Sequence, residues 1–249
     1  MDDKNYFSDI AQQYQRNRPD YPSEIFQYLS MVCDNHQLAW DVGTGTGQAA
    51  AQLANQFDKV IATDESIEQI AHAKKFPNVT YLRETAENAT LEDQSVDLIT
   101  VAQALHWFDF DAFMQQVERV LKPGGIFAAW CYSLVHINPE VDKSIKLLYD
   151  DILGDYWSKR RHWIDAGYSN FEFPHPLLMP PKIQMEITWS YQQFADYLRT
   201  WSAVQKYKSM EGEDPVNLIL QPLEFAWCDT GHMKKCMWPL QFKIFRKPA

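Results

Sequence analysis

The segment Ala39–Gln48, with the sequence AWDVGTGTGQ, constrains the fold of this chain more than any other. Apolar residues lead to an acid, Asp41, and three glycines then alternate with two threonines. Such glycines allow a positive φ and let a ligand approach the backbone without obstruction by a Cβ atom. A helix that opens after the loop presents N–H groups and a partial positive charge. The segment therefore predicts a strand, a tight loop and a helix start that together bind a nucleotide-like ligand.

Strands and helices are expected to alternate around this loop over about 95 residues. The expected strands are 38–42, 59–63, 79–82, 96–103 and 126–132, and the expected helices are 46–56, 66–75 and 109–121. Ser66 with Gln69 forms a capping-box pattern at one helix start. The near-continuous apolar run at 96–103 is typical of a strand buried on both faces. This alternation predicts an α/β fold with a doubly wound, mostly parallel sheet.

The two ends of the chain are expected to complete this sheet and cover it. Helices are predicted at 6–18 and 23–33, with Ser23 as the cap of the second. In the last third of the chain, residues 140–173 are rich in aromatic residues and are expected to be helical. Strands are expected there at 182–189 and 237–245, and helices at 191–207 and 215–227. The two late strands bring the sheet to seven, one of them antiparallel. We expect one domain: 1–37 over the ligand, 38–132 as the core, 133–235 as a helical lid with a late strand, and 236–247 as the final strand.

Composition narrows the class of protein. The formal net charge of −10 argues against a general nucleic-acid binder, which usually presents a basic face. The four cysteines never form C-x-x-C, so we expect reduced thiols and no structural metal site. The start of the chain lacks the apolar stretch of a signal peptide, and no apolar run reaches 18 residues. These features predict a cytoplasmic protein without a membrane segment.

Two ligands compete for the glycine loop, a dinucleotide and S-adenosylmethionine. The dinucleotide fingerprint is G-x-G-x-x-G, whereas here the glycines are Gly43, Gly45 and Gly47 and an acid, Asp41, precedes them. A carboxylate at that place repels a pyrophosphate but can engage the cationic amino-acid part of S-adenosylmethionine. Asp64, at the end of the second strand, suits two ribose hydroxyls in either case. The pattern favours S-adenosylmethionine and disfavours a nicotinamide dehydrogenase.

Several segments carry a family resemblance. They are Asp41–Gly47, Asp64, Thr85–Glu87, Val96–Gln103 and Leu121–Gly125. In order and spacing they resemble the class I S-adenosylmethionine-dependent methyltransferases, with the methyltransferase type 11 pattern over 38–131. Three further segments are similar to the trans-aconitate methyltransferase-like branch: Tyr14–Pro22, Ala104–Asp109 and Tyr197–Ser202. The resemblance implies a Rossmann-like methyltransferase fold and methyl transfer from S-adenosylmethionine.

The resemblance also implies which residues contact the cofactor. These are Asp41, Gly43, Thr44, Gly45, Asp64, Ser66, Ile67, Ala86, Glu87 and Gln103. The loop residues would line the methionine and ribose, and Asp64 would hold the ribose hydroxyls. Ser66, Ile67, Ala86 and Glu87 would border the adenine. Thr85 departs from the pattern, since many members have an acid there.

Three residues are candidates on the acceptor side of the site. Gln103 would lie beneath the transferred methyl group, and Arg18 would fold over the site and pair with a substrate carboxylate. His106 is either a base or substrate contact, or a packed histidine that orients its loop. A carboxylate acceptor is already anionic at neutral pH and needs no base, whereas an alcohol, amine or carbon acid would use His106. The branch resemblance favours a small carboxylic acid.

A small-molecule acceptor is the leading prediction, with two alternatives. The first alternative is methylation of a protein or RNA, against which the acidic composition and the aromatic lid argue. An Asn-Pro-Pro-Tyr type motif for base methylation is absent after the fourth strand, where Ala102–Leu105 stands. The second alternative is a methyltransferase-like module that binds the cofactor without turnover.

Overall fold

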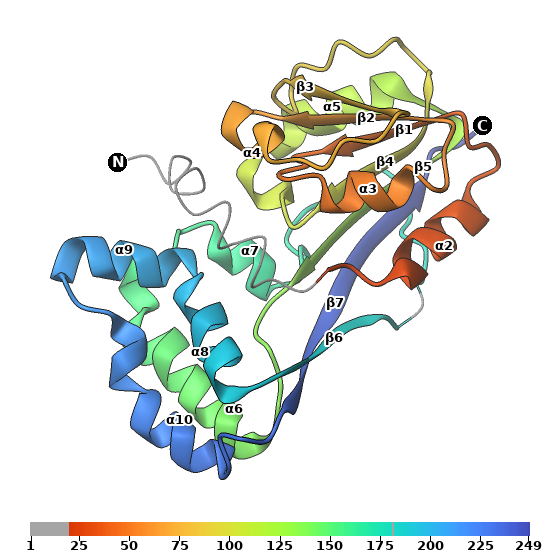
Figure 1. Cartoon of the computed structure of the whole chain (residues 1–249). Helices are drawn as coiled ribbons and strands as arrows, with labels where there is room; N and C mark the ends of the chain where they lie inside the picture. Colours follow the sequence, from red (N-terminus) through yellow and green to blue (C-terminus); the bar gives the residue numbers. More distant parts are fainter. Residues whose placement is uncertain (1–19, 181) are drawn as a thin grey trace. The chain divides into compact units, whose positions relative to one another are not determined.

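Seven strands form one sheet in the computed structural model, which describes residues 20–180 and 182–249 (Figure 1). The strand order is β3-β2-β1-β4-β5-β7-β6. The strands are β1 (Leu38–Val42), β2 (Lys59–Asp64), β3 (Val79–Arg83), β4 (Val96–Ala102), β5 (Leu121–Tyr132), β6 (Gln184–Trp189) and β7 (Lys234–Arg246). The first five pair in parallel, and β7 runs antiparallel to both β5 and β6. The predicted seven-stranded, mostly parallel sheet with an antiparallel late strand is confirmed.

The strand order reverses between β1 and β4. From β1 the chain proceeds outward through β2 to β3, and it then crosses back to place β4 on the other side of β1. At such a reversal the loops that follow β1 and β4 diverge to opposite faces and leave a crevice at the carboxyl ends of the strands. The glycine loop follows β1 and His106 follows β4, so both lie at the carboxyl ends of the two strands between which the order reverses.

The two faces of the parallel strands are covered by different helices. Alternate strand residues point to opposite faces. Trp40 of β1 meets Phe113 of α5 (Phe110–Val120) edge-on, with ring centroids 6.1 Å apart. On β5, Trp130 instead contacts Tyr21 and Phe26 edge-on. Phe26 lies on α2 (Ser23–Val32), which packs against α3 (Gln48–Leu53). The core therefore has two aromatic layers, one on each side of the sheet.

Several predicted helix ends differ from the structure by a few residues. α2 begins at Ser23 with Pro22 as its cap, so the predicted cap at Ser23 is wrong. α4 (Ile67–Ala71) is capped by Ser66 as predicted but ends four residues before the predicted end at Lys75. There His72 Nδ1 hydrogen-bonds the carbonyl of Glu68, which satisfies one carbonyl of the last turn. β5 begins at Leu121, directly after α5 and before the predicted start at 126.

The described residues divide into two compact units. The core unit comprises 20–133, 162–180, 182–183 and 240–249, and the helical unit comprises 134–161 and 184–239. The core unit contains β1 to β5, the second half of β7, and nearly all of α7 (Arg161–Asp165). The helical unit contains α6 (Pro139–Lys146), η3 (Leu147–Ile152), η4 (Gly154–Tyr156), α8 (Tyr191–Arg199), α9 (Ser202–Glu211), η5 (Pro215–Leu218) and α10 (Leu220–Trp227), together with β6.

The helix predicted over 191–207 is wrong, because the chain breaks between α8 and α9 at Thr200 and Trp201. The hydroxyl of Thr200 donates to the carbonyl of Tyr197, and Trp201 adopts an extended backbone. The Trp201 ring then packs edge-on against Tyr149 and lies near Trp157, with centroids 6.0 and 5.6 Å away. Aromatic packing within the helical unit thus overrides the helical periodicity of the sequence.

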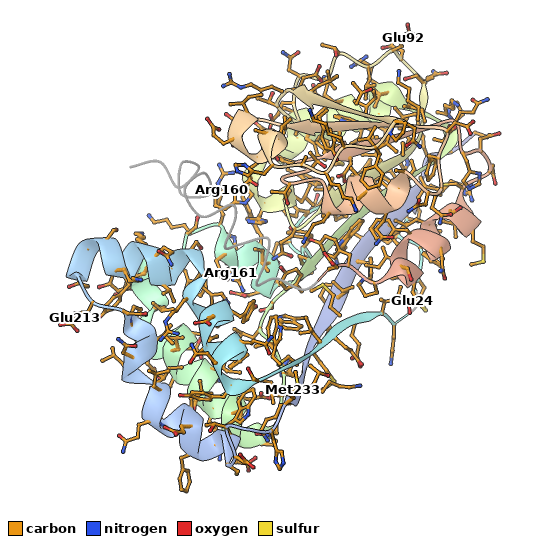
Figure 2. All side chains as sticks on the ribbon, viewed as in Figure 1. Glu24, Glu92, Arg160, Arg161, Glu213 and Met233 are labelled. Atoms are coloured by element: carbon orange, nitrogen blue, oxygen red, sulfur yellow. The ribbon has the colours of Figure 1, made fainter. Side chains whose placement is uncertain are left out.

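Arg161, which is labelled in Figure 2, packs on the rings of Tyr149 and Trp157 in this cluster. Its Nε donates to the hydroxyl of Tyr149 at 2.8 Å, and its guanidinium lies 4.8 Å from the ring centroid of Trp157. Arg161 is therefore held by both a hydrogen bond and contacts with aromatic rings within the helical unit.

Further observations concern cysteines, metals and membranes. The four cysteines lie in the described part of the chain, and none of them forms a disulfide. Within 20–180 and 182–249, no group of three acidic, histidine or cysteine side chains is arranged to hold a metal ion. Among those same residues, no helix has the length and apolar character needed to cross a bilayer.

Candidate functional site

The glycine loop has the backbone that its sequence predicts. Gly43, Gly45 and Gly47 have φ values of +64°, +57° and +80°. The Thr44 N–H donates to the carbonyl of Thr63 at 2.9 Å, which joins the loop to the end of β2. Gly47 then caps α3. The loop is thus a left-handed turn fixed between two neighbouring parallel strands.

The three glycines have different surroundings. A Cβ atom on Gly43 would lie 2.7 Å from the Cβ of Ala104, and one on Gly47 would lie 2.4 Å from the Tyr81 hydroxyl oxygen. A Cβ on Gly45 would meet, among the described residues, only Gln69 Oε1 at 4.0 Å. Gly43 and Gly47 are therefore closely surrounded by the protein's own side chains, while Gly45 leaves room for a ligand beside the backbone.

Asp64 links the loop to the next helix. Its Oδ2 accepts from the Gly45 N–H at 2.8 Å, and its Oδ1 accepts from the Ser66 N–H at 2.9 Å. Burial raises the pKa of this carboxyl group above its ordinary value. A carboxylate offers about four acceptor positions, so each oxygen retains capacity for a hydroxyl donor. Asp64 can hold a diol while it fixes the backbone next to it.

Asp41 lies inside the loop. It is 1% exposed, and its two carboxylate oxygens accept from the hydroxyls of Thr44 and Thr100. Burial raises the pKa of Asp41 to about 6, against the lowering effect of these hydrogen bonds. Asp41 therefore braces the loop against β4 and places a buried acidic group beneath it.

The residues predicted to border an adenine lie at the start of α4, after β2, and on the loop after β3. Ser66 Oγ accepts from the Gln69 N–H, and Ile67 is 49% exposed despite its apolar side chain. Ala86 is buried in the hydrophobic core. Glu87 accepts from the N–H of Asp109 at 2.8 Å, so its carboxylate is bonded to the start of α5.

The segment after β4 lies directly against the glycine loop. A Cβ atom added to Gly43 would meet Ala104 and Phe108 first. Gln103 has a φ of +56°, unusual for a residue other than glycine. Its side-chain amide donates to the Tyr132 carbonyl at 3.1 Å and accepts from the Tyr132 N–H at 2.8 Å. Gln103 thus joins the ends of β4 and β5, and its amide is engaged by backbone.

His106 lies in the short helix η2 (Leu105–Trp107) and is 4% exposed. Its Nδ1 is 3.2 Å from the hydroxyl oxygen of Tyr168. Arg18, the third acceptor-side candidate, lies outside the described residues. Of the acceptor-side candidates, the structure therefore brings Gln103 and His106 to one end of β4.

Two residues of this arrangement were not predicted. Thr100 pairs with Asp41 across β4 and β1, and its position as the one hydroxyl residue in β4 is a signal that could have indicated it. Tyr168 follows α7 and is separated by 62 residues from His106, and no local pattern connects the two.

Comparisons with known proteins agree with this geometry. Residues 40–129 match the family model described as "Methyltransferase domain". A methyltransferase-family protein of Dictyostelium discoideum is 34% identical over 234 residues, which cover 92% of this chain and 88% of that protein. The structure of a protein from Anaeromyxobacter dehalogenans, described as a type II methyltransferase, superimposes with a TM-score of 0.87. Its sequence is 38% identical, and the match covers 93% of this chain and 99% of that one.

A more distant structure shares the fold alone. It is a Haemonchus contortus phosphoethanolamine N-methyltransferase in complex with S-adenosylhomocysteine, at 17% identity and a TM-score of 0.51. The match covers 99% of this chain and 58% of that protein. The family-model match and the near full-length relatives coincide with the glycine loop, Asp64 and the sheet described above. The chain therefore belongs to the S-adenosylmethionine-dependent methyltransferase family.

Proposed function

We propose that this protein transfers a methyl group from S-adenosylmethionine to a small-molecule acceptor. The observation that carries the proposal is the pairing of Gly45 with Asp64. Gly45 has open space beside its backbone, and its N–H is bonded to a carboxylate that keeps capacity for further hydrogen bonds. A ribose diol beside a glycine backbone is the ligand that such a pair suits.

The residues present fit the cofactor in charge as well as in space. Asp41 and Asp64 supply acidic groups on the loop side, which suit the cationic ammonium and sulfonium groups. Ile67 supplies an exposed apolar side chain for the adenine, and Ala86 and Glu87 would border its edge. When bound, S-adenosylmethionine supplies an electrophilic methyl group. The protein would hold the acceptor in line with it, since positioning accounts for much of the catalysis in such a displacement.

A small carboxylic acid is the acceptor class that we propose, in agreement with the sequence resemblance to the trans-aconitate methyltransferase-like branch. A carboxylate is anionic at neutral pH and needs no proton removed. Arg18 would then orient the carboxylate, while Gln103 and His106 would line the pocket at the end of β4.

Calorimetric titration with S-adenosylmethionine and S-adenosylhomocysteine tests cofactor binding. We expect saturable binding by the wild type. Asp64→Ala should weaken it by at least about tenfold, because hydrogen bonds to a charged group contribute roughly 1.5–3 kcal/mol. Gly45→Val should abolish it by filling the open space. Asp34→Ala, which removes a surface carboxylate, is the matched control and should bind normally. A folded wild type that binds neither ligand would contradict the proposal.

Transfer of an isotope-labelled methyl group to a panel of metabolites tests the acceptor. The panel should hold small carboxylic acids, alcohols and amines, with total RNA and protein extract as separate arms. Labelling of a carboxylic acid supports the proposed class. Labelling confined to RNA or protein would favour a macromolecular substrate, and cofactor binding without any transfer would favour a binding module.

A further inference from the structure

Gln103 turns the chain after β4 in a backbone conformation that glutamine rarely adopts. Its φ of +56° lies in the left-handed region, which few residues other than glycine occupy. Such strain persists only where the surroundings determine the conformation, and strained residues of this kind gather at functional sites. The contacts that Gln103 makes therefore hold it in this conformation.

Three hydrogen bonds join Gln103 to the last residues of β5. Its N–H donates to the carbonyl of Trp130 at 2.9 Å, as in an ordinary ladder between parallel strands. Its side-chain Nε2 donates to the carbonyl of Tyr132 at 3.1 Å, and its Oε1 accepts from the Tyr132 N–H at 2.8 Å. A carboxamide carries a donor and an acceptor, as a peptide group does. The side chain of Gln103 thus continues the β4–β5 ladder beyond the end of β4.

The next residue, Ala104, lies against the glycine loop. A Cβ atom added to Gly43 would lie 2.7 Å from the Cβ of Ala104. Because β4 lies between β1 and β5 in the sheet, residues 103 and 104 connect the loop after β1 with the end of β5. Ligands of open α/β sheets bind at this carboxyl edge, beside the reversal of strand order. The turn at Gln103 therefore sets the place of the β5 end relative to the glycine loop.

The two sides of this turn would serve different ligands. Under the proposed function, the cofactor occupies the glycine loop and Asp64, at the ends of β1 and β2. The ends of β4 and β5 then remain for the acceptor. Given that function, we infer that Gln103 is a positioning residue, which acts through the backbone of Tyr132 and Ala104 to hold the acceptor side of the site in place relative to the cofactor loop.

This role differs from the one that the family resemblance implies, a contact of Gln103 beneath the transferred methyl group. A residue in contact with the methyl group changes the affinity for the cofactor. A positioning residue leaves that affinity almost unchanged and lowers the rate of transfer, because the reacting groups are then held less well in line.

The role also explains why glutamine occupies this position. Glutamate has the same length and can accept from the Tyr132 N–H, but its carboxylate has no donor for the Tyr132 carbonyl. Asparagine keeps the amide and tolerates a positive φ better than glutamine does. Its side chain is one methylene shorter, however, so it does not reach both groups of Tyr132. The two substitutions therefore separate charge from length.

Amide hydrogen exchange at Tyr132, followed by NMR, tests the bond. Gln103→Asn should speed this exchange by about tenfold, since one protecting hydrogen bond is lost. Gln94→Asn is the matched control, because Gln94 is an exposed glutamine of the core unit with a φ of +48°. Gln103→Gly, in which a positive φ carries no steric penalty, repeats the test if Gln103→Asn does not fold. Unchanged exchange without the Gln103 side chain would overturn the inference.

Titration with S-adenosylmethionine and S-adenosylhomocysteine separates positioning from contact. Sulfur is positively charged in the first ligand and neutral in the second. A carboxylate beneath the methyl group would favour S-adenosylmethionine by roughly tenfold or more relative to the wild type. We expect instead that Gln103→Glu leaves the ratio of the two affinities within about threefold of the wild-type ratio, as for charges that are apart and screened. A tenfold change in the ratio would overturn the inference.

Kinetics with the acceptor labelled in the panel test the effect on transfer. Gln103→Asn should lower kcat by about tenfold or more, because small misplacements of reacting groups are costly. Its affinity for S-adenosylhomocysteine should stay within about threefold of the wild type, and Gln94→Asn should match the wild type in both values. An unchanged kcat, despite faster exchange at Tyr132, would show that the bond serves stability alone.

The same measurements distinguish failure of this inference from failure of the proposed function. A folded wild type that binds neither S-adenosylmethionine nor S-adenosylhomocysteine refutes the proposed function. Normal binding by the wild type, together with an unchanged kcat in Gln103→Asn, refutes only the role assigned to Gln103.

Discussion

At the scale of single residues, the glycines of the loop share one backbone conformation but serve different purposes. All three have positive φ, and only the space around each of them tells the packing glycines from the one that admits a ligand. A glycine pattern predicts the conformation, because only glycine adopts it without a steric penalty. It does not predict which atoms a Cβ added at each glycine would meet, because those atoms belong to residues far along the chain.

We predict that Gly47→Ala destabilises the protein by about 2–4 kcal/mol. The cost combines the left-handed backbone with a Cβ placed 2.4 Å from the Tyr81 hydroxyl oxygen. Gly212→Ala is the matched control, since its φ is +77° and no heavy atom of the described residues lies within 4 Å of the added Cβ. It should cost only about 1–2 kcal/mol. Urea denaturation measures both, and equal losses would contradict the close contact at Gly47.

The raised pKa of Asp41 should make the folded protein less stable as the pH rises. Its pKa is raised to about 6 by burial, while an unfolded aspartate keeps a pKa of 3.8. Between these values the folded protein binds the proton and the unfolded chain does not, so stability falls as pH rises through this range. The nearby charge of Asp64 adds to the effect.

We therefore expect the stability of the wild type relative to Asp41→Asn to fall by roughly 2 kcal/mol between about pH 4 and pH 7. The asparagine variant does not titrate at this position, so the difference between the two proteins isolates Asp41. Urea denaturation across this range measures it. A difference that stays constant or rises with pH would show that the folded pKa of Asp41 is not raised.

At the scale of elements, the carboxyl ends of β1 and β4 serve the candidate site, and their amino ends serve stability. The carboxyl ends of β1 and β4 carry the loops of the candidate site, whereas their amino ends are joined by Asp97. Its Oδ2 accepts from the N–H groups of Gln37 and Leu38, and its Oδ1 accepts from Lys122 Nζ at 2.7 Å. Asp97 is 4% exposed, and these three donors compensate its buried charge.

Asp97→Ala should lower stability by about 3–5 kcal/mol, because it leaves partners of a buried carboxylate unsatisfied. Affinity for S-adenosylhomocysteine, measured under conditions where the variant is folded, should stay unchanged since Asp97 lies at the other end of the strands. Asp34→Ala, which breaks an exposed pair with Arg246, should cost at most about 1 kcal/mol. Loss of cofactor affinity in folded Asp97→Ala would contradict a purely stabilising role of Asp97.

The elements also show where sequence patterns succeed. The cap at Ser66 is a local feature, in which the side chain accepts from an N–H three residues later, and the structure contains it as predicted. Asp109 makes the same kind of cap at the start of α5, where the sequence predicted a helix start but no cap. The break at Thr200 and Trp201 is different, because it depends on aromatic rings from 149 and 157. The spacing of apolar residues continues through the break, so periodicity alone predicts one helix over 191–207.

At the scale of the whole molecule, charge bears on the substrate class. A net charge of −10 repels polyanions at long range, most strongly at low ionic strength, and added salt screens this repulsion. We predict no measurable binding of a fluorescein-labelled RNA by fluorescence polarisation at low salt, where electrostatic attraction would be strongest. A basic control protein should bind the same RNA. Salt-sensitive binding by this protein would favour the alternative of RNA methylation.

The sequence by itself determined the strands from β1 to β5, the left-handed glycine loop, the acids Asp41 and Asp64, and the seven-stranded α/β class. These follow from periodicity, glycine conformation and short-range hydrogen bonding, which act within a few residues. Only the tertiary structure decided that Asp41 is braced by Thr100, that the amide of Gln103 is bonded to Tyr132, and that Tyr168 reaches His106. Each of these contacts joins residues 29 to 62 positions apart, and such pairs form because of how strands and turns pack, which no local pattern encodes.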